Sequence, residues 1–142
     1  MQRELLWKSF EDLKKAQKLL ESSLKTYKPY EPSKEYGPEE LEQYDALSFR
    51  FSKFVELCLN FFTLLEMYLF GEKSETLRDR LLRLERGGYI KDHELWIKAR
   101  LLRNKLIHPY LPEELAELLD FVVKYSRELL EELKHVEARI KA

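Results

Sequence analysis

The sequence predicts an all-α protein, an antiparallel up-and-down bundle of about five helices. Its 142 residues correspond to about one domain. Only four glycines and five prolines are present, which leaves few turns and therefore favours long elements. Apolar residues recur at helical intervals along most of the chain, and no strand-like alternation of useful length and no internal repeat appears. Hydrophobic residues make up 44% of the chain, enough for one core.

The first predicted helix covers about residues 3–27. Its apolar stripe follows steps of three, four and seven residues: Leu6, Phe10, Leu13, Leu20 and Leu24. The stretch "KPYEPSKEYG" then breaks the helix with two prolines and a glycine.

The second predicted helix covers residues 38–70. Pro38 suits a first helical position, the acidic Glu39 and Glu40 favour the positive end of the helix dipole, and Gly71 ends the run. Its main apolar stripe is Leu47, Phe51, Phe54, Cys58, Phe61, Leu65 and Tyr68, and further apolar residues lie beside it. Such a broad apolar surface predicts a central helix, or one buried against a second subunit.

The remaining chain predicts three further helices. Ser74 is placed to cap a helix over 74–86, which two glycines end, and Asp92 to cap the next, over about 92–107. Pro112 begins the last helix, which runs towards the C-terminus. Five helices with short connections fit an antiparallel bundle.

Several classes of protein are disfavoured by the composition. The single cysteine, Cys58, excludes an internal disulfide framework, fits a reducing cytosol and is expected to pack in the core. The N-terminus carries charge throughout, unlike a signal peptide, and the most apolar run is interrupted by Glu56, Asn60 and Glu66, so we expect a cytoplasmic protein without a membrane span. The three histidines are scattered and no glycine-rich phosphate loop is present, so we expect no metal and no cofactor.

Charge is unevenly distributed although the formal net charge is only −1. Residues 73–108 hold ten Lys or Arg and five Asp or Glu, a local balance of +5. This basic segment is either an ordinary solvated helix face or a footprint for an anion such as a phosphate.

The basic segment ends in "ARLLRNKLIHPY", residues 99–110. Arg100, Asn104 and His108 are four residues apart and share one helical stripe, with Arg103 beside it. The core-facing candidates of this helix are Ile97, Leu101, Leu102 and Leu106. Cations near a helix C-terminus are favourable by roughly 0.3–1 kcal/mol, so these residues have an ordinary structural explanation.

A chemical explanation is also open. Histidine is the side chain that exchanges a proton near neutral pH, and arginine binds phosphate and stabilises added negative charge. Asparagine orients either group by hydrogen bonding. Together these residue types suit metal-independent cleavage of RNA, in which the 2′-hydroxyl attacks the neighbouring phosphate.

The segment "RNKLIHPY", Arg103 to Tyr110, resembles the motif of HEPN-domain proteins, specifically the HepT-like toxins: an arginine, four residues, a histidine, one residue and a tyrosine. We expect one HEPN-like bundle domain over 1–142, with an N-terminal helix and loop in 1–37 and a core in 38–142; the resemblance itself covers about residues 40–135 as a pattern of helices. It also implies a homodimer that acts as a metal-independent endoribonuclease and is paired with a minimal nucleotidyltransferase antitoxin, which transfers AMP to the motif tyrosine.

Carried over to this sequence, the resemblance gives each motif residue a role. Arg103 would stabilise the phosphate, His108 would act as acid or base, Asn104 would orient them, and Tyr110 would accept the AMP group. Arg100 is added from helix geometry, and it and Lys105 are candidates for phosphate or RNA binding. The alternatives are a non-catalytic nucleotide- or substrate-binding partner of a minimal nucleotidyltransferase, and a structural helical dimer whose polar stripe has no catalytic role.

Overall fold

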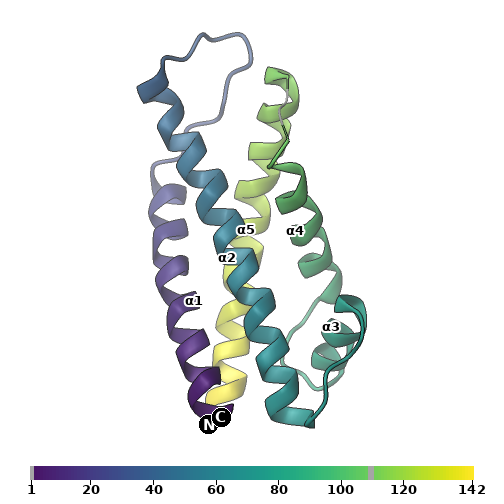
Figure 1. Cartoon of the computed structure of the whole chain (residues 1–142). Helices are drawn as coiled ribbons and strands as arrows, with labels where there is room; N and C mark the ends of the chain where they lie inside the picture. Colours follow the sequence, from purple (N-terminus) through teal and green to yellow (C-terminus); the bar gives the residue numbers. More distant parts are fainter. Residues whose placement is uncertain (1, 109–110) are drawn as a thin grey trace.

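The computed structural model describes residues 2–108 and 111–142. These residues form five α-helices and no strand (Figure 1): α1 (Gln2–Lys25), α2 (Pro38–Phe70), α3 (Leu77–Arg86), α4 (His93–Lys105) and α5 (Pro112–Lys141). The predicted all-α fold is therefore confirmed. None of the helices in the described ranges combines the length and apolar character that crossing a membrane requires.

The helices form an elongated bundle. The long helices α1, α2 and α5 run along its length, and both ends of the chain lie together at one end of the bundle (Figure 1). The two shorter helices, α3 and α4, follow α2. Helix α4 lies away from α1, whereas α5 runs back along the bundle and contacts both α4 and α1 (Figure 1). Helix α2 packs against α1 over most of its length and also contacts α3, α4 and α5, so it is the central helix that its broad apolar surface predicted.

The core follows the apolar stripes of the sequence. The buried stripe residues include three aromatic side chains of α2, Phe51, Phe54 and Phe61, and Phe62 beside the stripe is buried as well. Cys58 is completely buried among them, and burial raises the pKa of its thiol. Its expected role in core packing is thus confirmed.

The start of α3 differs from the prediction. Ser74 was expected to cap this helix, but the cap is Thr76, whose hydroxyl accepts a hydrogen bond from the Asp79 N–H at 3.1 Å. Ser74 is instead committed to Glu66, the buried carboxylate near the end of α2: its N–H lies 2.9 Å and its hydroxyl 2.5 Å from that carboxylate. The Ser74 prediction is wrong because a tertiary contact competes for the same side chain.

Two arginines of α3 also form ion pairs with Glu66. Its carboxylate pairs with Arg80 at 3.0 Å and with Arg83 at 3.5 Å. Burial by itself would raise the pKa of Glu66, but the hydrogen bonds from Ser74 and Arg80 outweigh burial and hold that pKa below its ordinary value. This carboxylate therefore fixes α3 to the end of α2.

A tyrosine cluster orders the connection between α1 and α2. The rings of Tyr30 and Tyr36 stack with centroids 4.8 Å apart, and the Tyr44 hydroxyl donates a hydrogen bond to the Lys28 carbonyl at 2.8 Å. The Tyr27 hydroxyl reaches α5; burial, reinforced by the nearby Asp120 carboxylate, raises the pKa of Tyr27 to about 12. The proline-containing segment therefore packs on the bundle through its aromatic residues.

Candidate functional site

The helix that carries the motif is held firmly at its first turn. Asp92 caps α4 as predicted, accepting hydrogen bonds from backbone N–H groups of the first turn at 3.0 and 3.4 Å. The buried carboxylate of Glu132, on α5, accepts the N–H of Lys91 at 3.1 Å and the indole N–H of Trp96 at 3.0 Å. Trp96 is buried against Phe62 of α2, their ring centroids 4.8 Å apart and perpendicular. These contacts fix the orientation of α4 relative to α2 and α5.

That orientation places the predicted stripe on the surface. Arg100 and Asn104 are exposed on α4, and His108 is exposed just beyond its end. Arg103 is half-buried, on the border between the stripe and the core. Lys105 is exposed and is the last residue of α4, whose end lies two residues before the predicted position at 107.

The motif extends past the helix in a turn. The His108 N–H donates to the Lys105 carbonyl at 3.2 Å, which keeps the imidazole close to the end of α4. Pro109 and Tyr110 lie outside the described residues. The structure therefore shows the placement of Arg103, Asn104 and His108, while the expectation for Tyr110 stays a prediction.

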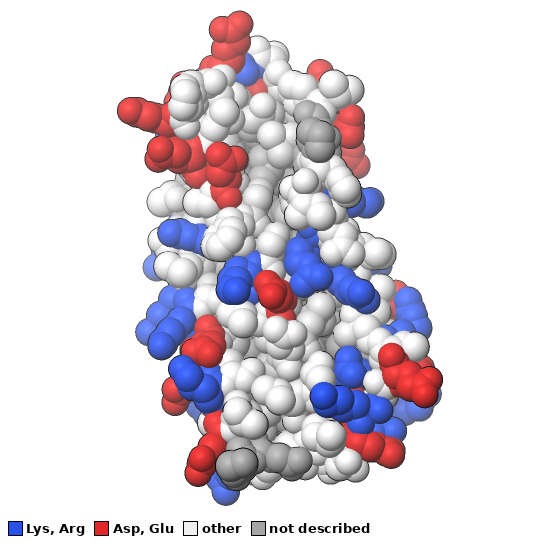
Figure 2. All heavy atoms as spheres, in the orientation of Figure 1, with Lys and Arg blue, Asp and Glu red and all other residues white. Residues whose placement is uncertain are grey.

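The charged side chains in the C-terminal part of α4 are all positive. Residues 95–108 contain four Lys or Arg and no Asp or Glu. Within the described ranges, no carboxylate forms an ion pair with any of these four cations: Lys98, Arg100, Arg103 and Lys105. Figure 2 shows several Lys and Arg side chains, with an acidic side chain among them, midway along α2 and α4, whereas Asp and Glu crowd the end of the bundle where α2 begins. An anion would thus find positive charge that has no described carboxylate partner.

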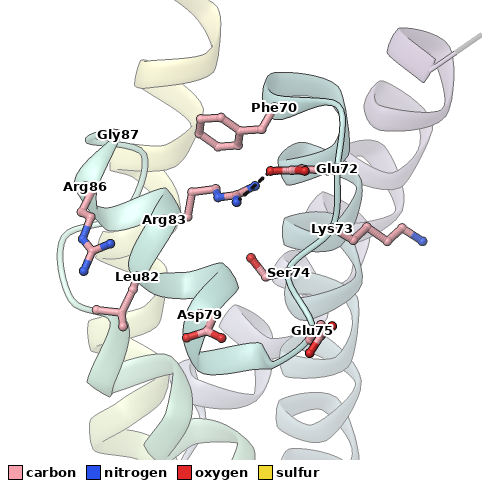
Figure 3. Close-up of a pocket in the computed structure, with 10 residues that line it drawn as sticks. All are labelled: Phe70, Glu72, Lys73, Ser74, Glu75, Asp79, Leu82, Arg83, Arg86 and Gly87. Atoms are coloured by element: carbon pink, nitrogen blue, oxygen red, sulfur yellow. Dashed lines mark hydrogen bonds and ion pairs between the residues drawn. The ribbon is translucent and has the colours of Figure 1, made fainter.

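A surface hollow of about 700 Å³ lies elsewhere, between the end of α2 and α3 (Figure 3). Arg83 points into it beside the ring of Phe70, 5.1 Å from the ring centroid, and its guanidinium pairs with Glu72 at 3.2 Å as well as with Glu66. Two carboxylates therefore already neutralise this arginine. The hollow is a weaker anion site than the α4 surface, where no described carboxylate competes.

The structure also brings a histidine and two carboxylates together at the start of α4. One ligand-type atom from each of Glu85, Asp92 and His93 lies within 4.8 Å of the others. This group was not predicted from the sequence, because Glu85 comes from the preceding helix. Glu85 accepts hydrogen bonds from the backbone N–H of His93 at 3.2 Å and contacts its ring Nδ1 at 2.9 Å, while Asp92 caps α4. Helix capping accounts for the arrangement, so it carries no metal assignment.

One core-facing prediction on α4 is wrong. Leu101 is 55% exposed, whereas Leu102 beside it is buried. The reason is that α5 does not close over this side of α4, and a groove remains between the two helices with Leu101 on its wall.

No protein-family model matches the chain, and no curated protein matches it significantly.

Proposed function

We propose that this protein is a metal-independent endoribonuclease of the HepT-like type, the toxin subunit of a toxin–antitoxin pair. The observation that carries the proposal is the end of α4: a half-buried arginine and an exposed histidine on a surface whose cations have no described carboxylate partner. Because Arg103 is only half-buried, its guanidinium can offer its donors to a phosphate.

The reaction follows from these side chains. His108 takes the proton of the RNA 2′-hydroxyl, whose oxygen attacks the adjacent phosphorus. Arg103 binds the phosphate oxygens and stabilises the negative charge that develops on them, and Asn104 orients the reacting groups by hydrogen bonding. The new P–O2′ bond replaces the P–O5′ bond. The products are a 2′,3′-cyclic phosphate and a 5′-hydroxyl end.

Two copies of the motif serve this reaction better than one. The leaving 5′-oxygen needs a proton while the 2′-hydroxyl loses one, and a single imidazole cannot hold both positions at the same moment. A homodimer with its two motifs facing a shared cleft supplies a second histidine and doubles the cationic density around the phosphate.

A minimal nucleotidyltransferase is the proposed antitoxin. It would transfer AMP to the phenol oxygen of Tyr110, two residues beyond His108. The added phosphate would pair with Arg103 in place of the RNA phosphate and block the site without a change of fold.

Incubation with RNA in the presence of EDTA tests the cleavage step. We expect the wild-type protein to leave cyclic phosphate ends, and His108→Ala and Arg103→Ala to lower the rate by about 100-fold or more. Arg127→Ala, which removes an exposed arginine on α5, is the matched control and should retain activity. Cleavage that requires a divalent metal, or that persists in His108→Ala, would contradict the mechanism. A wild-type protein that binds the nucleotidyltransferase but never cleaves RNA would favour the non-catalytic binding partner.

Intact-mass measurement tests the modification. After incubation with a cognate nucleotidyltransferase and ATP, the wild-type protein should gain the mass of AMP and Tyr110→Phe should not. Tyr125→Phe, a partly buried tyrosine of α5, is the control and should still be modified. An adduct that persists in Tyr110→Phe would refute the assignment.

A further inference from the structure

A groove between α4 and α5 opens beside the predicted stripe of α4. It has a volume of about 530 Å³, within the range of ligand pockets, and its apolar lining consists of Leu101, Leu102, Leu118, Phe121 and Tyr125. Leu101 precedes Asn104 by three residues and Lys105 by four, so on the helix surface it adjoins both the stripe and the groove. An RNA strand held at the motif would therefore pass the groove.

The apolar lining includes a partly exposed aromatic pair. The ring centroids of Phe121 and Tyr125 are 5.7 Å apart, and Phe121 is 37% exposed. Leu101, across the groove on α4, is 55% exposed. Exposed aromatic side chains are the surfaces on which unpaired bases of single-stranded RNA stack. A base that lies on Phe121 would cover apolar area that the fold leaves open.

The two sides of the groove carry opposite charges. Lys98 and Lys105 line it from α4, whereas Glu114 and Glu117 line it from α5. Within the described part of the chain, none of these four side chains forms an ion pair. The lysines are therefore available to RNA phosphates, and the carboxylates, which only accept hydrogen bonds, are available to N–H groups of a base.

A carboxylate distinguishes the bases by their hydrogen-bond donors. Guanine carries two donors side by side on its Watson–Crick edge, N1–H and the N2 amino group, which match the two oxygens of one carboxylate. Adenine and cytosine place an acceptor nitrogen beside their amino group, and uracil places its N–H between two carbonyls. A carboxylate therefore meets a repelling lone pair on each of these three bases, and guanine is favoured.

We infer that the α4–α5 groove is a subsite for an unpaired guanine of the RNA substrate. The base lies on Phe121, and Glu114 or Glu117 accepts its N1–H and N2 amino hydrogens. Lys98 and Lys105 hold the adjoining phosphates. The inference rests on the proposed function for RNA as the ligand, and it adds a base preference that the motif itself does not supply.

Fluorescence anisotropy with RNA that cannot be cleaved tests the subsite. The probes are a short single-stranded 2′-O-methyl oligouridine and the same oligonucleotide with one central guanosine. We expect the wild-type protein to bind the guanosine probe about tenfold more tightly. Inosine in place of guanosine should remove most of this advantage, because inosine lacks the N2 amino group.

Paired variants assign the preference to the groove. Glu114→Gln combined with Glu117→Gln should reduce the preference to about twofold or less, because a neutral amide has only one acceptor oxygen. The matched control combines Glu128→Gln with Glu131→Gln, which makes the same charge change at the same spacing on α5 and should keep the preference.

The stacking surface has its own pair of variants. Phe121→Ala should weaken binding of the guanosine probe about tenfold, whereas Phe49→Ala, at an exposed phenylalanine of α2, should not. Circular dichroism confirms that each variant is folded, and light scattering records its mass.

The outcomes separate this inference from the proposed function. Equal binding of the two probes, or a preference that survives the paired Glu114 and Glu117 substitutions, would overturn the inference. A Phe121→Ala variant that changes only in mass would also overturn it and would assign the groove to a subunit contact. A guanine preference in a protein that never cleaves ordinary RNA contradicts the proposed function alone, whereas cleavage without any guanine preference contradicts the inference alone.

Discussion

Replacement of Glu132 by alanine removes the contact that places α4. Its carboxylate accepts the Lys91 N–H at 3.1 Å, the Asp92 N–H at 3.3 Å and the Trp96 indole N–H at 3.0 Å, and the side chain is buried. The three donors belong to the segment that begins α4. Among the described residues, no other side chain of α5 hydrogen-bonds to these donors, so the variant removes the hydrogen bonds that join the start of α4 to α5.

The magnitude follows from what each donor meets after the substitution. Lys91 and Asp92 are exposed, so water replaces the carboxylate at their N–H groups. Trp96 is completely buried, and its indole N–H is left without an acceptor, which costs about 1–3 kcal/mol in addition to the lost charge-assisted bond. We therefore expect Glu132→Ala to lower the free energy of unfolding by about 2–4 kcal/mol, a large part of the 5–15 kcal/mol typical of a domain. Glu132→Gln keeps one acceptor oxygen and should lose about half as much.

Urea denaturation followed by circular dichroism measures this loss. The matched control is Glu131→Ala, which removes the neighbouring exposed glutamate of α5 and should change the free energy of unfolding by less than about 0.5 kcal/mol. A loss below about 1 kcal/mol in Glu132→Ala would show that the packing of Trp96 on Phe62 alone holds α4, and the reasoning would fail.

Three further outcomes are expected. Because the pKa of Glu66 is lowered in the folded protein, its contribution to stability is full above the ordinary value of 4.5 and is lost as the pH falls below it; Glu66→Gln should therefore show a smaller drop in melting temperature between neutral and acid pH, and an equal drop would contradict this. Arg103→Lys keeps the charge but loses the planar fork of donors, so kcat/KM for RNA cleavage should still fall at least about tenfold, and full activity would argue against bidentate phosphate binding. Tyr44→Phe keeps the ring but removes the hydrogen bond to the Lys28 carbonyl, and should lower the free energy of unfolding by about 1 kcal/mol in urea denaturation; no change would mean that water already satisfies that carbonyl.

The helices were predictable because periodicity and helix ends are local signals. The prediction of α2 over 38–70 matches the structure at both ends, since Pro38 and Gly71 act through the backbone of their own residues. Ser74 shows where such signals fail. Its ability to cap a helix is a local property, but its actual partner, Glu66, lies on α2, eight residues earlier in the chain.

The sequence predicted which residues of the candidate site share one face of α4, but it did not predict the packing around that face. Four-residue spacing was sufficient to place Arg100 and Asn104 together on the exposed side of α4. It could not reveal that Leu101 would be left uncovered, because that depends on the separation of α4 from α5. The role of Glu132 was equally hidden, since a glutamate in a charged stretch of α5 looks like a solvated residue until its three donors are in place.

Cys58 gives the protein an internal reporter of its own opening. Its thiol is completely buried and is the single thiol of the chain, so a soluble thiol reagent reaches it only when α2 separates from its neighbours. The labelling rate under native conditions then measures how often the centre of the bundle opens, and the raised pKa of the thiol slows any reaction in the closed form. Comparing that rate with the free energy of unfolding from urea would distinguish a bundle that opens only as a whole from one in which a single helix detaches first.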